Sequence, residues 1–126
     1  MAGLTYDSGA LIAAERNDRR LWAIHIRAME RGVLPVVPSV ILAQTWRGGP
    51  QTSLERLLHG CQVESLSDPA ARRTGVSLAQ SHTTDVPDAT VVTSAMQRQD
   101  TVVTGDRADI EGIAHALGWR PNIIDI

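Results

Sequence analysis

A carboxylate falls on the apolar stripe of a helix predicted near position 88. Pro87 suits the first turn of a helix, and at 100° per residue Asp88 shares one face with Val92 and Ala95. A buried and unpaired carboxylate is costly, so a divalent cation, an arginine or a water-filled cleft is expected to offset its charge. The alternative is a capping box, in which Asp85 caps the helix and Asp88 is its partner three residues later.

Two further aspartates follow short β-prone runs, Asp7 after residues 4–6 and Asp106 shortly after residues 101–104. Strands that alternate with helices predict a parallel sheet, and such sheets bind ligands beyond the carboxyl ends of their strands. We therefore expect Asp7, Asp88 and Asp106 to converge at one sheet edge, where a hard cation such as Mg²⁺ offsets their mutual repulsion. The simpler alternatives are a helix cap for Asp7 and a turn for Asp106.

The hydrophobic pattern predicts the elements that must position these acids. A proline–serine pair at residues 38–39 is expected to open a helix, and Gln44 lies on the apolar stripe of that helix. An amide is therefore placed there, much as the carboxylate of Asp88 lies on the apolar stripe of the helix near position 88. Gly32 and Gly118 are expected to end helices, and Asp68 to cap one. Strands are expected at residues 4–6, 33–37, 61–66, 101–104 and 122–125. The other helices are expected at residues 10–16, 20–31, 52–58, 68–81 and 110–117, and the helix that carries Asp88 is expected to begin at about residue 87.

Length and composition favour one soluble domain spanning residues 1–126, since 43% of the residues are apolar. All 12 basic residues are arginine, but the net charge of −2 does not identify a nucleic-acid binder. Cys61 is the only cysteine, which excludes an internal disulfide and fits a cytoplasmic protein. No run approaches the ~20 apolar residues of a membrane span. The four histidines share no metal-ligand spacing, and three tryptophans, Trp22, Trp46 and Trp119, are expected in the core.

Four segments, in their order and spacing, resemble the motifs of PIN-domain nucleases, and most closely those of VapC-type toxin ribonucleases. The resemblance implies a Rossmann-like, three-layer α/β/α PIN fold with a mostly parallel sheet, Mg²⁺- or Mn²⁺-dependent RNA hydrolysis, and a small VapB-type antitoxin as partner. By position, it assigns metal binding to Asp7, Asp88 and Asp106. The segments are Leu4-Thr5-Tyr6-Asp7, Val37-Pro38-Ser39-Val40-Ile41-Leu42-Ala43-Gln44, Pro87-Asp88-Ala89 and Val103-Thr104-Gly105-Asp106.

Gln44 departs from the family pattern, which usually has a glutamate at that position. An amide oxygen can still ligate a cation or orient a water, but it attracts Mg²⁺ less and cannot act as a base near neutral pH. Asp85 or Asp109 would be the nearest acids to compensate, and Glu15 is a more remote candidate.

The expected reaction is attack of a metal-activated water on an RNA phosphodiester, which leaves a 5′-phosphate. One alternative is a catalytically silent PIN fold that acts by binding RNA or a partner. A second is a metal-dependent phosphatase or receiver domain, although a receiver usually needs a lysine and this chain has none. Arg16, Arg19, Arg20 and Arg47 could meet phosphates or antitoxin carboxylates, with solvated arginine as the simpler alternative. The RNA target and a homodimer stay open.

Overall fold

The structure, a computed structural model, describes residues 3–126. Within this range five strands form one sheet in the order β3-β2-β1-β4-β5, and every neighbouring pair is parallel. The strands are β1 (Leu4–Tyr6), β2 (Val36–Pro38), β3 (Gln62–Glu64), β4 (Thr101–Thr104) and β5 (Ile123–Asp125). The helices are α1 (Ser8–Glu15), α2 (Arg19–Glu30), α3 (Ser39–Thr45), α4 (Thr52–His59), α5 (Asp68–Ser81), α6 (Val86–Arg98) and α7 (Arg107–Ala116).

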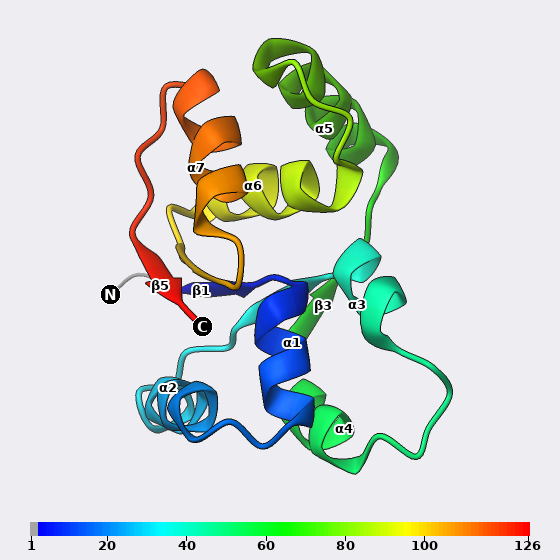
Figure 1. Ribbon diagram of the computed structural model, residues 1–126, viewed down its shortest axis with the longest axis vertical. Coiled ribbons are helices and arrows are strands. Elements are labelled where there is room, and N and C mark those ends of the chain that lie inside the picture. The colour runs from blue at the N-terminus through cyan, green and yellow to red at the C-terminus, as the bar shows by residue number, and fades with distance from the viewer. Residues whose placement is uncertain (1–2) are drawn as a thin grey trace.

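Helices cover both faces of the sheet. In Figure 1, α1, α2 and α4 lie below the strands and α5, α6 and α7 lie above them. This arrangement confirms the predicted three-layer α/β/α fold with a parallel sheet. Because all the strands run in one direction, their carboxyl ends share one edge, at which α1, α3 and α7 begin. None of the described helices is long and apolar enough to cross a membrane.

The core lies between the two central strands and the helices that flank them. Tyr6 of β1 and Val103 of β4 are completely buried, together with Leu11 of α1 and Val92 of α6. Short, continuous apolar runs such as β4 are typical of parallel strands that are covered on both faces. The sequence therefore marked the central strands by composition more clearly than by alternation.

A buried histidine completes the core on the side of α2. His25 is 1% exposed, its Nδ1 lies 2.9 Å from the hydroxyl of Tyr6, and its ring packs edge-on against Trp22. Burial lowers the pKa of His25, so the neutral ring is favoured at this position. His25 therefore packs in the core between Tyr6 and Trp22.

Several predicted boundaries shift by a few residues. Helices α1 and α7 begin earlier than predicted, directly after Asp7 and Asp106. The prediction that Asp68 caps α5 is wrong, because Ser67 is the N-cap residue and its hydroxyl accepts from the backbone N–H of Ala70 (3.3 Å). The expected strand at 61–66 is reduced to the edge strand β3. The expected strand at 33–37 begins and ends later, as β2.

The tryptophans differ in their environment. Trp22 and Trp119 pack against the core as expected. Trp46, in contrast, directly follows α3 and is 37% exposed, so its predicted core position is wrong. The glycine-rich segment after it, Gly48-Gly49, leads the chain over the surface rather than through the core.

The end of α6 is fastened to the sheet by one arginine. The guanidinium of Arg98 donates to Asp100 (2.8 Å) and to Glu64 (2.8 Å), and also to the hydroxyl of Thr5 (3.1 Å). Asp100 is only 4% exposed, and Thr5 donates a second hydrogen bond to its carboxylate (2.8 Å). Arg98 thus joins α6, β1 and β3, and it fixes where the opposite end of α6, with Asp88, lies over the sheet.

Replacing Arg98 with Gln should lower the free energy of unfolding by about 2 kcal/mol, because the buried Asp100 carboxylate loses its cation while the site stays partly solvated. Chemical denaturation measures the change. Arg72→Gln is the matched control, since its pair with Asp68 is exposed and should contribute less than about 0.5 kcal/mol. Equal losses in the two variants would contradict the structural role of Arg98.

Candidate metal centre

All four residues predicted for the site line one pocket at the carboxyl edge of the sheet. The pocket has a volume of about 270 Å³, and both β1 and β4 end at it. Its lining residues are Asp7, Ser8, Gly9, Ile12, Gln44, Asp85, Asp88, Gly105 and Asp106. The structure therefore brings together acids that lie as far apart in the chain as positions 7 and 106.

Asp7 is the most deeply buried of these acids, with 3% of its surface exposed. One carboxylate oxygen accepts from the backbone N–H of Ala10 (3.1 Å) and caps α1, and the other accepts from the hydroxyl of Thr104. Burial raises the pKa of Asp7, and these hydrogen bonds oppose that effect. The capping alternative for Asp7 is thus correct, and the same carboxylate also faces the pocket.

The loops after β1 and β4 touch each other through their backbones. A Cβ atom on Gly9 would lie 2.6 Å from the amide nitrogen of Gly105 and 2.8 Å from its Cα atom. Only glycine at position 9 permits this approach without displacing backbone. The close contact is what places Asp7 and Asp106, from separate strands, at the walls of one pocket.

The tightest acidic group consists of Asp85, Asp88 and Asp109, each of which offers one oxygen within 4.8 Å of the others. Asp85 caps α6 by accepting from the backbone N–H of Asp88 (3.0 Å). The N–H of Asp85 donates to the hydroxyl of Thr83 (3.3 Å), so the carboxylate of Asp88 does not complete a capping box. Asp88 instead faces the other acids. From the sequence, Asp85 and Asp109 are predicted only as acids that could compensate for Gln44, because both positions also suit the start of a helix.

Crowding changes the acidity of this group. Burial raises the pKa of Asp88 to about 7, and the charge and hydrogen bond of Asp85 and the charges of Asp106 and Asp109 add to the effect. The pKa of Asp109 is also raised, and the largest cause is a side-chain hydrogen bond with Asp106. Carboxylates that repel one another in this way suit a hard divalent cation, which takes oxygen ligands and offsets the charge. The donor set of the pocket therefore fits Mg²⁺ or Mn²⁺.

Gln44 lies on α3 and is exposed, whereas Ile41 of the same helix is buried. Because Gln44 lines the acidic pocket, it is not a packed core amide. Glu15 does not line this pocket. Its carboxylate accepts from the side-chain amide of Gln51 (2.8 Å) in an adjoining cavity.

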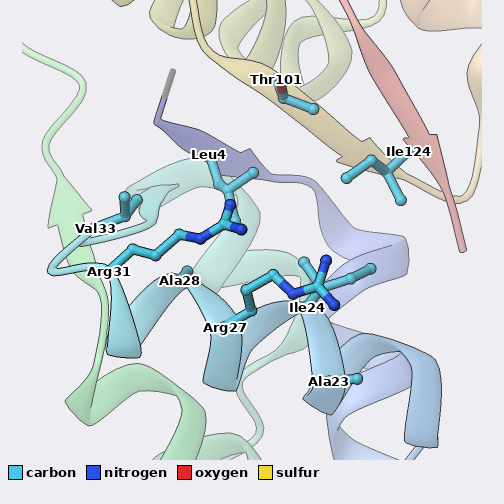
Figure 2. Close-up of a pocket in the computed structure, with 9 residues that line it drawn as sticks. All are labelled: Leu4, Ala23, Ile24, Arg27, Ala28, Arg31, Val33, Thr101 and Ile124. Carbon is cyan, nitrogen blue, oxygen red and sulfur yellow. The ribbon is translucent and has the colours of Figure 1, made fainter. Parts of the chain in front are cut away.

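A separate cavity of about 410 Å³ lies between α2 and the strands β1, β4 and β5. Figure 2 shows Arg27 and Arg31 extending from α2 along this cavity, which Leu4 and Ile124 also line. None of its lining residues is acidic, so it offers no carboxylate to a cation. The acidic pocket, although smaller, carries several carboxylate side chains that could bind a metal ion.

Three solved structures share this fold over almost the whole chain. VapBC2 from Rickettsia felis, bound to a DNA fragment from its promoter, matches with a TM-score of 0.67 at 12% identity, covering 98% of both chains. PAE2754 from Pyrobaculum aerophilum has a TM-score of 0.61 at 15% identity, covering 97% of this chain and 83% of that one. FitAB bound to the IR36 DNA fragment has a TM-score of 0.59 at 12% identity, covering 97% and 94%.

Neither a family model nor a curated protein matches the sequence. At 12–15% identity the structural likeness concerns the fold alone. The chain has the three-layer α/β/α fold of these proteins, a PIN-like fold, with an acidic pocket at the carboxyl edge of its sheet.

Proposed function

We propose that the chain is a metal-dependent endoribonuclease and the toxin of a type II toxin–antitoxin pair. The observation that carries the proposal is the crowding of aspartates from β1, α6 and the start of α7 around one pocket of a PIN-like fold. Such crowding is unfavourable without a cation, and phosphodiester hydrolysis is a reaction for which proteins use cations held by carboxylates.

Asp7, Asp88 and Asp106 would hold one or two Mg²⁺ or Mn²⁺ ions, with Asp85 and Asp109 beside Asp88 as further oxygen donors. A bound divalent ion would supply an activated water and stabilise the leaving oxygen. The hydrogen bonds from Thr104 and the Ala10 N–H oppose the rise that burial causes in the pKa of Asp7, and so favour the ionised form that binds a cation.

A small VapB-type antitoxin is the proposed partner. VapBC2 is a two-component assembly by its name, and both VapBC2 and FitAB were solved with DNA. An exposed acidic pocket with Arg47 nearby invites a partner segment that carries an arginine or acidic side chains. Binding of such a segment would restrain a cytoplasmic nuclease.

A silent PIN fold that only binds RNA or a partner is the second candidate. It is favoured by Gln44, which brings a neutral amide to the pocket where the family usually has a glutamate. The loss of one carboxylate weakens the attraction for Mg²⁺. The two candidates differ in whether cleavage accompanies RNA binding.

Incubation of the purified protein with structured RNAs should give cleavage with Mg²⁺ or Mn²⁺ and none with a chelator. Asp88→Asn should lower the cleavage rate at least about 100-fold, because it removes a central oxygen ligand. Gel analysis of 5′-labelled RNA measures the rate. Glu55→Gln, an exposed acid in the first turn of α4, is the control and should cleave normally. Metal-independent cleavage, or full activity of Asp88→Asn, would contradict the mechanism.

Asp88→Asn should also stabilise the metal-free protein, and more strongly at pH 8 than at pH 5. At a pH between 3.8, the ordinary pKa, and about 7, the pKa in the folded chain, Asp88 is protonated in the folded chain and ionised in the unfolded chain. The free energy of unfolding therefore falls as the pH rises through this window. In Asp88→Asn this loss of stability does not occur, because the asparagine side chain does not ionise. Because Asp88 is half-buried, we expect a gain of about 1 kcal/mol at pH 8 after screening.

Chemical denaturation in the presence of a chelator measures this gain at both pH values. Glu55→Gln, which removes an exposed carboxylate outside the acidic group, is the control for this comparison. Addition of Mg²⁺ should reverse the order, because the cation stabilises the original chain more than Asp88→Asn. A destabilised Asp88→Asn in chelator would mean that Asp88 serves only the helix start.

Gln44→Glu should increase the response of the melting temperature to Mg²⁺. The substitution adds a carboxylate to the wall of the acidic pocket, which tightens cation binding but increases repulsion when the cation is absent. A melting-temperature titration against Mg²⁺ should therefore start lower and rise further than in the original chain. An unchanged titration would show that position 44 does not contact the cation.

A further inference from the structure

A second cavity, of about 400 Å³, adjoins the acidic pocket. The two share Ile12 and Gln44 among their lining residues, so they lie directly next to each other. The remaining lining residues are Glu15, Thr45, Arg47, Gly49, Pro50 and Gln51, from the end of α1 to the start of α4. Its volume is within the range of pockets that bind small organic ligands.

Gln51 makes this cavity a built feature. It is only 8% exposed, and its side-chain oxygen accepts from the backbone N–H of Arg47 (2.7 Å). Its amide nitrogen donates to the carbonyl oxygen of Thr45 (2.9 Å) and to the carboxylate of Glu15 (2.8 Å). One buried side chain therefore holds the loop after α3 and the carboxylate of Glu15 in place.

A guanidinium is held at the same cavity. The side chain of Arg47 donates to the backbone carbonyls of Gln44 (2.8 Å) and Trp46 (2.8 Å), and its contact with Ala43 is longer (3.4 Å). Arg47 and Glu15 form no ion pair among residues 3–126, so both charges are available to a ligand. The cavity thus offers a fixed cation and a fixed anion beside the candidate metal centre.

We propose that this cavity is the subsite for a guanine nucleotide of the RNA, an inference that rests on the proposed nuclease function. Arg47 contacts a phosphate of the strand, because a guanidinium is suited to phosphate oxygens. Ile12 and Pro50 supply apolar surface for the base. Glu15 reads the edge of the base by accepting its hydrogen bonds.

Guanine is the base that matches a carboxylate. Its Watson–Crick edge presents two adjacent N–H donors, N1–H and the N2 amino group, to the two oxygens of Glu15. Adenine and cytosine offer one amino donor beside an acceptor, and uracil offers one donor between two carbonyl oxygens. The hydrogen bond from Gln51 leaves lone pairs on both carboxylate oxygens, so the bidentate contact is open. Single-stranded RNA is commonly read through such base edges.

The test is a titration of the ¹⁵N-labelled protein with guanosine 5′-monophosphate and inosine 5′-monophosphate in the presence of Mg²⁺. These mononucleotides differ only in the N2 amino group, and neither has a phosphodiester bond to cleave. We expect guanosine monophosphate to bind roughly tenfold more tightly than inosine monophosphate, because the latter lacks one of the two hydrogen bonds to Glu15. The largest shifts should fall on the Arg47 backbone amide and the Gln51 side-chain amide.

Glu15→Gln should bind the two nucleotides equally. It should retain the fold, because a glutamine oxygen can still accept from Gln51. Glu55→Gln should retain the tenfold preference. Equal binding of both nucleotides to the original chain, or a preference that survives in Glu15→Gln, would overturn the subsite.

A randomised RNA incubated with Mg²⁺ separates the subsite from the nuclease function. Guanine preference in the titration without any RNA cleavage would overturn the nuclease function and support the subsite. Cleavage without guanine enrichment beside the cut, or with enrichment unaltered in Glu15→Gln, would overturn the subsite and support the nuclease. Enrichment that disappears in Glu15→Gln supports both.

Discussion

Repulsion among carboxylates is the constraint that the rest of this structure must satisfy. Asp85, Asp88 and Asp109 present oxygens within 4.8 Å of one another, and Asp7 and Asp106 reach the same region. Burial first, and then the neighbouring carboxylates, raise the pKa of Asp88 to about 7, so ionising it destabilises the metal-free chain. Such an arrangement persists only where the surrounding fold is rigid enough to hold it, and where a bound ligand offsets the charge.

Two sets of contacts provide that rigidity, one at the pocket and one at the opposite end of α6. The backbone contact between Gly9 and Gly105 locks together the loops that follow the two central strands, and Thr104 hydrogen-bonds Asp7 across the same junction. At the far end of α6, Arg98 ties the helix to β1 and β3.

Side chains of both charges lie around the candidate metal centre. The acidic pocket suits a divalent cation, and the adjoining cavity sets Arg47 and Glu15 at fixed positions beside it. Under the proposed function, the phosphates of an RNA strand would meet Arg47 and its base edges would meet Glu15. The buried side-chain amide of Gln51 joins Glu15 to the loop that carries Arg47, because it hydrogen-bonds both.

The sequence by itself determined a parallel sheet and the convergence of Asp7, Asp88 and Asp106 at its carboxyl edge, because apolar runs alternate with helix periods. The resemblance to PIN-domain nucleases supplied the three-layer arrangement. Only the tertiary structure decided the roles of the residues around them. Local patterns could not show that Asp85 and Asp109 stand against Asp88, since both also suit helix starts. Nor could they show Gln51 joining Glu15 to the loop after α3, because that contact links residues 36 positions apart in the chain.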